Sequence, residues 1–204
     1  MKLKKKLNVG VIGLGVGEQH VKGYFLNENC NLKSICDLDS KKLKTISSRY
    51  KKLKTTRQAN DILKDPEIDI VSIASFDNFH HEQILVALEN NKHIFVEKPL
   101  CLTRKELNSI IKTYKNKKNL ILTSNFILRK TKRFIQLKEN IRKGFLGNIY
   151  YLEGDYDYGR LHKINKGWRG TLENYSVVHG GAIHLIDLLI WFLEKKVVEV
   201  FAYG

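Results

Sequence analysis

Short apolar runs and amphipathic segments alternate along the first part of the chain. The apolar runs are rich in β-branched residues and nearly continuous, which is typical of strands covered on both faces. They span residues 9–12, 32–36, 70–74, 93–96 and 120–123. Between them, apolar side chains recur at helical spacing, over residues 18–26, 40–50, 78–89 and 103–114. Thr103 and Glu106 add the Thr-x-x-Glu capping-box pattern at the head of the last helix.

This alternation predicts an α/β fold. Strands separated by helices at this spacing form βαβ units, and successive units build a Rossmann-type, doubly wound parallel sheet. The pattern continues to about residue 124, so we expect residues 1–124 to form the first domain.

The pattern changes after residue 124. A helix is expected over residues 131–143, and the alternation over residues 148–158 suits an antiparallel strand with one face in solvent. A second helix (181–193) and a second strand (197–203) follow. Residues 125–204 therefore look like the start of an α+β domain with an antiparallel sheet. Two strands are too few for a stable sheet, so either this domain is truncated or its sheet is unusually small.

Composition and charge narrow the class of protein. The 204 residues are 43% hydrophobic and 28% charged, as in globular chains, and no apolar run reaches the roughly 18 residues of a membrane span. Lysine and arginine exceed aspartate and glutamate by 36 to 21, a net charge of +15. The lysines are scattered and lack the interleaved aromatic residues that bind single strands, which favours a solvated surface over a nucleic-acid partner.

Cysteine usage points to a reducing compartment. The three cysteines are an odd number and include no Cys-x-x-Cys pair, so neither a disulfide framework nor a metal site is indicated. We therefore expect a cytoplasmic protein without a bound metal.

A glycine-rich turn joins the first strand to the first helix. Gly13, Gly15 and Gly17 surround Val16 in this turn. In a strand-turn-helix context, glycines let the backbone approach a pyrophosphate, which then lies at the helix N-terminus. The usual third glycine would fall at position 18, where this chain has Glu18, so we expect a turn one residue tighter. These four turn residues are candidate dinucleotide contacts.

Asp37 ends the second predicted strand, 24 residues after Gly13. An acidic side chain at this place can accept hydrogen bonds from the adenosine ribose hydroxyls. The alternative is a helix cap or turn residue. Because a carboxylate repels a 2′-phosphate, the sequence favours NAD over NADP, although Lys41 and Lys42 lie close enough to weaken the preference.

The motifs of the chain together resemble the glucose-fructose oxidoreductase, inositol dehydrogenase and rhizopine-catabolism (Gfo/Idh/MocA) family of nicotinamide-dependent oxidoreductases. The resemblance covers nearly the whole chain. It is carried by the glycine turn, Asp37, the Asn-x-His-x-Glu stretch at 78–82, Glu97-Lys98-Pro99, Trp168-Arg169, and Gly-Gly-Ala-Ile-His-Leu-Ile-Asp at 180–187. The Glu-Lys-Pro tripeptide is its most specific element.

The resemblance implies roles for individual residues. Lys98 would contact the reacting hydroxyl, His184 would act as acid and base, and Glu97 would bind the nicotinamide ribose. The Lys98–Pro99 bond would be cis. The other candidate cofactor contacts are Ser75, Asn78 and His80, and the candidate substrate contacts include Trp168, Arg169 and Asp187.

Physical chemistry supports these roles independently. Ligands of an open parallel sheet bind beyond the carboxyl ends of its strands, where Gly13, Asp37, Ser75 and Lys98 are expected. Hydride transfer from a carbinol needs a base for the hydroxyl proton and a cation for the developing alkoxide, which His184 and Lys98 can supply.

Each candidate also has a structural alternative. Lys98 could be a solvated lysine, His184 a core residue of an apolar helix, and His80 a surface residue at a helix start. Asp187, three positions after His184, could orient that imidazole or support the fold.

One position departs from the family pattern. Many relatives carry an aspartate four residues before the histidine, where this chain has Gly180. His179 is adjacent, but a side chain one position away points elsewhere on a helix. Either Lys98 and His184 suffice for proton transfer, or activity is lost.

The sequence therefore predicts an NAD-dependent enzyme that transfers a hydride between nicotinamide and a carbinol of a sugar, polyol or nucleotide sugar. Pairing of subunits through the second domain is expected. The alternative is a catalytically silent, nicotinamide-binding regulator or scaffold, which Gly180 favours. A nucleic-acid-binding protein is a third interpretation and rests on charge alone.

Overall fold

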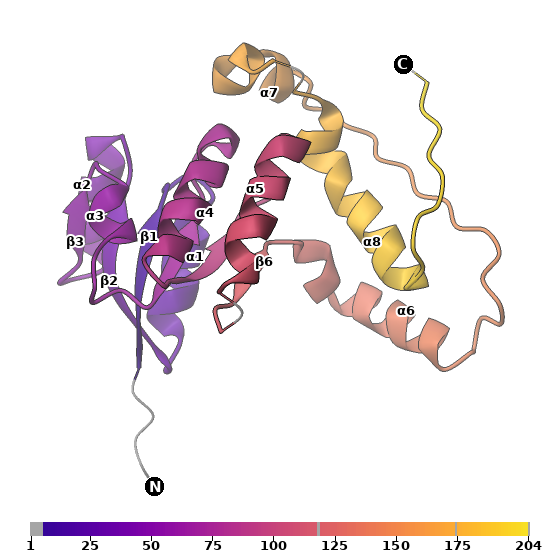
Figure 1. The fold of residues 1–204 in the computed structure, drawn as a ribbon, viewed down its shortest axis with the longest axis horizontal. Helices are drawn as coiled ribbons and strands as arrows, with labels where there is room; N and C mark the ends of the chain where they lie inside the picture. The colour runs from indigo at the N-terminus through magenta and orange to yellow at the C-terminus, as the bar shows by residue number, and fades with distance from the viewer. Residues whose placement is uncertain (1–5, 118, 174, 204) are drawn as a thin grey trace, which may run out of the picture. The chain divides into compact units, whose positions relative to one another are not determined.

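The computed structural model describes residues 6–117, 119–173 and 175–203. The chain divides into two compact units, Met1–Asn125 and Phe126–Gly204. Every strand among the described residues belongs to the first unit, drawn from indigo to magenta and red in Figure 1.

The first unit alternates strands with helices. In chain order its elements are β1 (Leu7–Ile12), α1 (Gly17–Leu26), β2 (Cys30–Cys36), α2 (Ser40–Arg49), β3 (Lys54–Thr56), α3 (Asn60–Leu63), β4 (Ile70–Ile73), the 3-10 turn η1 (Asp77–Phe79), α4 (His80–Glu89), β5 (His93–Val96), α5 (Arg104–Lys115) and β6 (Leu122–Ser124). The expected capping box of Thr103 and Glu106 is present at the start of α5.

The six strands form one sheet in the order β3-β2-β1-β4-β5-β6, and all neighbouring pairs are parallel. The strand order reverses between β1 and β4, as in a doubly wound sheet. This confirms the predicted Rossmann-type fold. The sequence pattern missed β3 because this edge strand is only Lys-Thr-Thr, with two of its three residues exposed.

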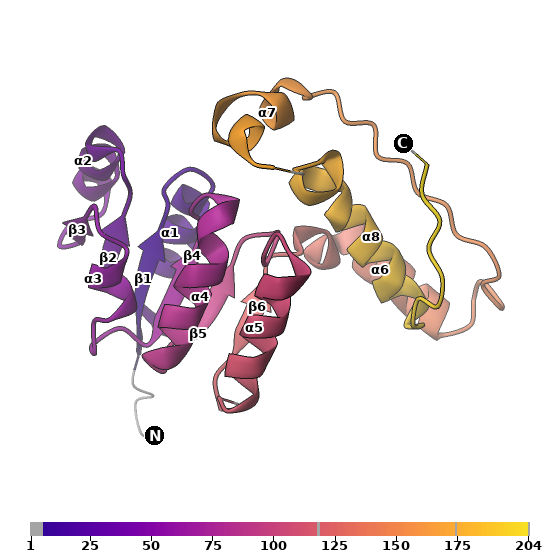
Figure 2. The same ribbon diagram turned by 45° about the horizontal axis from the view of Figure 1, so that its top comes forward.

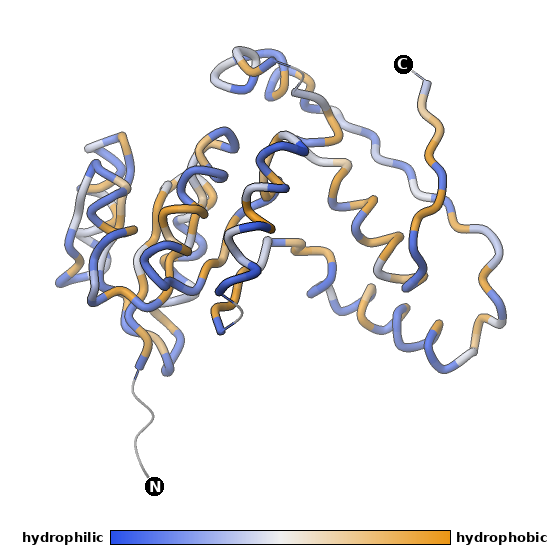
Figure 3. The backbone as a smooth tube through the Cα atoms, in the orientation of Figure 1, coloured by the Kyte–Doolittle hydropathy of each residue, from blue (hydrophilic) through white to orange (hydrophobic). Residues whose placement is uncertain are grey.

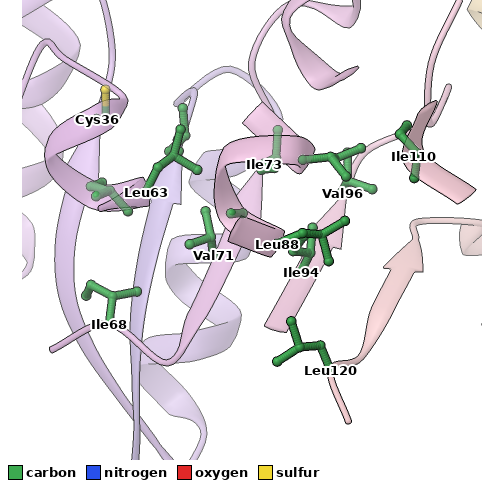
Figure 4. Close-up of a cluster of buried hydrophobic side chains, with 14 residues drawn as sticks. Cys36, Leu63, Ile68, Val71, Ile73, Leu88, Ile94, Val96, Ile110 and Leu120 are labelled. Atoms are coloured by element: carbon green, nitrogen blue, oxygen red, sulfur yellow. The ribbon is translucent and has the colours of Figure 1, made fainter. Parts of the chain in front are cut away.

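Both faces of the sheet are buried. Alternate residues of β1 point to opposite faces of the sheet. Val9 and Val11 pack with Val21 of α1 in one hydrophobic cluster, whereas Ile12 belongs to a second hydrophobic cluster. That second cluster is shown in Figure 4, where Leu88 of α4 lies beside Ile94 of β5. Two covered faces leave the strand ends as the places where polar side chains can meet a ligand.

The second unit consists of helical elements joined by long extended segments. They are the 3-10 turn η2 (Ile127–Lys130), α6 (Lys132–Arg142), α7 (His162–Asn165), the 3-10 turn η3 (Gly167–Thr171), the π-helical turn η4 (Val178–Ala182) and α8 (Ile183–Leu193). Within this unit α6 and α8 run side by side (Figure 2), with the rings of Phe134 and Phe192 6.0 Å apart. Among the described residues, no helix has the length and apolar character to cross a membrane.

The antiparallel strands expected at residues 148–158 and 197–203 are not confirmed. Both segments are extended but form no strand pairing. A strand needs a neighbour for its backbone hydrogen bonds, and these segments have none among the described residues. Figure 3 shows the second segment as mostly apolar, in keeping with its sequence Val-Val-Glu-Val-Phe-Ala-Tyr. Its side chains are open to solvent, as for Val198 at 95% exposure and Tyr203 at 99%.

Two glycines offer a matched test of the packing in the first unit. A β-carbon at Gly10 in β1 would collide with Cγ2 of the buried Ile62, whereas one at Gly23 in α1 would meet nothing within 4 Å. We expect Gly10→Ala to lower the free energy of unfolding by about 1–3 kcal/mol through overpacking. Gly23→Ala should raise it by about 0.5–1 kcal/mol, because alanine favours a helix. Urea unfolding measures both, and equal stability of the two variants would contradict the packing described.

Candidate functional site

The carboxyl ends of the parallel strands meet along one edge of the first unit. Residues just beyond the strands continue the ladders there: Gly13, Ala74, Glu97 and Asn125 each donate a backbone N–H to a carbonyl of a neighbouring strand, over 2.7–2.8 Å. Asp37 follows β2 at the same edge, with its N–H 3.3 Å from the carbonyl of Thr56. Polar side chains from distant parts of the sequence are therefore brought to one edge.

The glycines of the β1–α1 turn do three different things. Gly13 has φ +85°, and a β-carbon there would collide with the backbone of Ala74. A β-carbon at Gly15 would meet nothing within 4 Å, so the backbone is open to a ligand at this point. At Gly17 a β-carbon would lie 3.1 Å from Cβ of Ala74, so this glycine permits close packing of α1 on the sheet. These are the three requirements of a dinucleotide-binding turn.

Gly17 thus permits the close contact between helix and sheet that the third glycine, at position 18 in the usual spacing, would otherwise permit. Glu18 instead points toward α2, where its Oε1 accepts a hydrogen bond from Arg49 Nη1 over 2.6 Å. Val16, at the N-cap position of α1, is 60% exposed. The first N–H groups of α1 follow directly, which suits a phosphate.

Asp37 braces two neighbouring loops. Its Oδ2 accepts the N–H of Leu14 over 2.6 Å, and its Oδ1 accepts the N–H of Asp39 over 2.8 Å. The N-cap of α2 is Asp39, whose Oδ1 accepts the N–H of Lys41, so Asp37 is not the helix cap. An ionised carboxylate has about four acceptor positions, which leaves Asp37 capacity for hydroxyl groups of a ligand.

His80 is fully buried, at 0% exposure, and so is not the surface residue considered from the sequence. Its Nδ1 lies 2.7 Å from the carbonyl of Pro99 and its Nε2 3.3 Å from that of Ser75. The peptide bond between Lys98 and Pro99 is cis, as the family resemblance implied. With both ring nitrogens on protein carbonyls, His80 can influence a ligand only through the backbone that it supports.

Three more candidates lie around this segment. Ser75 donates its hydroxyl to Gln83 Oε1 over 2.7 Å, and Asn78 is exposed in η1. Lys98 is half-buried at the end of β5.

Glu97 is the centre of a polar cluster. Its Oε1 accepts a hydrogen bond from Asn125 Nδ2 over 2.7 Å and lies 3.0 Å from His20 Nε2. The other ring nitrogen of His20 is 2.9 Å from the hydroxyl of Ser72, which is completely buried in β4. Sequence analysis missed His20 and Asn125. A histidine one turn after the glycines and a serine inside an apolar strand were the available signals.

The protein environment favours the ionised form of Glu97. Burial raises the pKa of this carboxyl group, but the hydrogen bonds from His20 and Asn125, with the nearby charge of Lys98, outweigh burial and lower the pKa below its ordinary value.

In the second unit, Asp187 forms a two-pronged ion pair with Arg129. Nε of Arg129 donates to Oδ2 over 2.7 Å, and Nη2 donates to Oδ1 over 2.6 Å. Of the two roles considered for Asp187, this contact matches support of the fold.

His184 packs in α8 with its ring perpendicular to that of Phe126, at a distance of 6.2 Å between ring centres. Arg129 was missed because nothing in its local sequence distinguishes it from other surface arginines.

Trp168 and Arg169 form a stacked pair. The guanidinium carbon of Arg169 lies 4.2 Å from the ring centre of Trp168, and its Nε donates to the hydroxyl of Tyr175 over 3.0 Å. Tyr175 in turn packs against His179, whose Nδ1 is 3.1 Å from the hydroxyl of Ser176. His179 therefore belongs to this aromatic cluster.

Gly180 lies in the π-helical turn before α8. A β-carbon at this position would collide with the side chain of Ile164, which is only 6% exposed. An aspartate at this position would therefore require Ile164 of α7 to shift. Within the part of the chain that the structure describes, no group of three or more His, Cys, Asp or Glu is placed to hold a metal ion.

The environment of Glu97 predicts a pH effect on stability. Because its folded-state pKa lies below the ordinary value of 4.5, the ionised form contributes stability above that value, and the contribution is lost as pH falls through the folded-state pKa. We expect Glu97→Gln to destabilise the protein at neutral pH and the difference from wild type to shrink on acidification. Urea unfolding over a pH series tests this, with the exposed Glu28→Gln as control. A difference that grows on acidification would contradict the description.

Comparison with known proteins agrees with this geometry. Residues 7–126 match the model of the oxidoreductase family with an NAD-binding Rossmann fold, and residues 134–204 match the GFO/IDH/MocA C-terminal domain. A myo-inositol 2-dehydrogenase of Thermotoga maritima is 28% identical over 204 aligned residues, which cover 97% of this chain and 58% of the relative.

Solved structures show the same fold. Myo-inositol 2-dehydrogenase of Lactobacillus plantarum matches with a TM-score of 0.84 at 27% identity, over 93% of this chain and 57% of that one. Scyllo-inositol dehydrogenase of Lactobacillus casei, solved with NAD(H) and scyllo-inositol, matches with a TM-score of 0.82 at 23% identity, over 94% of this chain and 57% of that one. The chain thus spans somewhat more than half the length of these relatives. With both family domains matched and the glycine turn, Asp37 and Glu97-Lys98-Pro99 at one sheet edge, the chain belongs to the GFO/IDH/MocA oxidoreductase family.

Proposed function

We propose that the carboxyl edge of the first unit binds NAD(H). The observation that carries this proposal is the β1–α1 turn, where Gly13 and Gly17 bring α1 against the sheet and the open backbone at Gly15 leaves room for a pyrophosphate. Asp37 would accept the adenosine ribose hydroxyls, and Glu97 those of the nicotinamide ribose. The proposed set of contacts is completed by Val16, Ser75, Asn78 and Lys98. His80 would support the backbone next to Lys98 through the carbonyl of Pro99.

Charge at the adenosine end favours NAD over NADP. The carboxylate of Asp37 is held in place by two backbone N–H groups. Turning it away from a 2′-phosphate would break these hydrogen bonds. Electrostatic repulsion at this fixed position would disfavour the phosphorylated cofactor.

The proposed activity is oxidation or reduction of a carbinol on a polyol or sugar. When bound, the nicotinamide supplies the hydride acceptor or donor. Lys98 would donate a hydrogen bond to the substrate oxygen and stabilise its developing negative charge. His184 would accept the hydroxyl proton in oxidation and return it in reduction. Inositols are the favoured substrate class, because the relatives described above are named inositol dehydrogenases. Sugars and nucleotide sugars are the other classes to test.

The second unit, which starts at Phe126, one residue after the boundary expected from the sequence, is proposed to begin a substrate-binding domain. Its extended segments at 148–158 and 197–203 carry exposed apolar side chains, including Tyr150 and Phe201, which an antiparallel sheet would cover. We propose that such a sheet also pairs subunits. Trp168 and Arg169 are proposed substrate contacts, whereas Asp187 would act indirectly through Arg129. The free cysteines keep the cytoplasm as the proposed location.

A second candidate function is a silent, NAD-binding regulator or scaffold. It is favoured by Gly180, since no carboxylate stands one helical turn before His184. Binding of NADH without turnover on any substrate would distinguish it from an enzyme.

Cofactor binding is tested with Asp37. We expect titration calorimetry to show tighter binding of NAD than of NADP to the 204-residue chain. Asp37→Ala should weaken NAD binding about tenfold and reduce the preference, because it removes a charged acceptor and the repulsion together. Asp39→Ser, which keeps a helix cap on α2, is the matched control and should change neither value. Failure of wild type to bind either form of NAD would overturn the proposed function.

Turnover is tested with Lys98. NADH formation should be followed with a panel of inositols, sugars and nucleotide sugars. Lys98→Met should lower kcat by about 100-fold or more, because the ammonium group acts mainly on the charge that develops in the transition state. An equal rate in the variant would remove Lys98 from the mechanism.

A further inference from the structure

A continuous line of polar side chains runs through the interior of the first unit. It runs from Ser72 in the middle of β4 through His20 on α1 to Glu97 beyond β5. Ser72 is 0% exposed, and the side chains of His20 and Glu97 are 8% and 13% exposed. These groups are therefore shielded from water, and their contacts with each other decide their orientation.

The contacts fix which ring nitrogen of His20 faces Glu97. An ionised carboxylate only accepts, so Nε2 of His20 donates to Oε1 of Glu97 over 3.0 Å. The hydroxyl of Ser72 lies 2.9 Å from the other ring nitrogen, Nδ1. Burial raises the pKa of the nearby Tyr24 of α1, and its interaction with the Ser72 side chain opposes the rise.

Glu97 is held from two sides. His20 reaches it from the first turn of α1, and Asn125 Nδ2 reaches the same oxygen from the end of β6 over 2.7 Å. Both donors act on Oε1, so the lone pairs of Oε2 are the acceptors that a ribose hydroxyl can use. Lys98, the next residue in the chain, adds a positive charge nearby.

Apolar side chains would cost less at these buried positions. Polar groups inside a protein must be desolvated, and a partly satisfied network is more costly than none. His20 already lies 5.2 Å, between ring centres, from Phe95, so a leucine there would have an apolar neighbour. Packing alone therefore does not account for a histidine at this position, which points to a role for its ring nitrogens.

We propose that His20 is a positioning residue for Glu97, which it holds in the orientation that receives the nicotinamide ribose. This inference rests on the proposed function, since it assigns His20 a part in the same cofactor site. His20 acts through Glu97 and does not itself contact the cofactor. Because His20 also belongs to the helix that begins at the phosphate-binding turn, it links the two ends of the proposed site.

The first experiment compares NADH affinities of the 204-residue chain and its variants by calorimetry. His20→Leu removes the donor and should weaken binding about tenfold. His20→Gln places an amide N–H near the position of Nε2 and should recover most of that loss. His93→Leu is the matched control at the opposite end of β5, where His93 Nδ1 accepts the N–H of Ile121, and should bind like wild type. Wild-type affinity in His20→Leu would overturn the proposal.

A double-variant cycle separates positioning from a general loss of structure. If His20 acts only through Glu97, His20→Leu should have little further effect on NADH affinity once Glu97→Gln is present. Fully additive losses would overturn the proposal. If His20→Leu does not fold, His20→Asn replaces it, because the shorter amide stays polar but does not reach Glu97.

The second experiment needs no cofactor. The carboxyl carbon of Glu97 can be followed by NMR against pH in the unliganded protein. Loss of the His20 donor should raise the pKa of Glu97, while Asn125 and Lys98 remain in place. An unchanged titration would overturn the positioning role. A raised pKa in His20→Leu, with no NADH binding by wild type, would instead overturn the proposed function and the cofactor part of this inference.

Discussion

The close approach of the β1–α1 turn to the end of β4 is the constraint on which the rest of the site depends. Gly13 can take φ +85° against the backbone of Ala74 because it has no side chain. Gly17 then allows α1 to begin directly on the sheet, because a β-carbon at this position would lie only 3.1 Å from Cβ of the same alanine. One turn later this places His20 over Ser72 and beside Glu97. A single steric condition therefore shapes the proposed phosphate site and the polar cluster together.

The sheet itself explains why the chemistry gathers at one edge. Alternate residues of each central strand are buried on opposite faces, so neither face is available for a ligand. The carboxyl ends bring together the residues that follow five strands, and there Asp37 and Glu97 are each held by two hydrogen-bond donors. Both carboxylates are thus oriented before a ligand arrives, which reduces the ordering that binding requires.

The second unit depends on charged groups that hold helices together. Arg129 joins η2 to α8 through Asp187, and Lys138 of α6 donates to the carbonyl of Trp191 over 2.6 Å and pairs with Glu194 over 2.7 Å. The lysine thereby satisfies carbonyls at the C-terminal end of α8 and complements its dipole. These contacts hold α8, the helix that carries His184, in place.

The amino-acid sequence by itself determined the parallel sheet, the glycine turn, the acidic residue after β2 and the capped helix α5, because periodicity and turn chemistry are local properties of the chain. Only the tertiary structure decided that His80 faces carbonyls, that Asp187 pairs with Arg129, and that His20 meets Glu97. The physical reason is sequence distance: the partners of His20 lie 52 and 77 positions away, and no local pattern encodes which buried polar groups will satisfy one another.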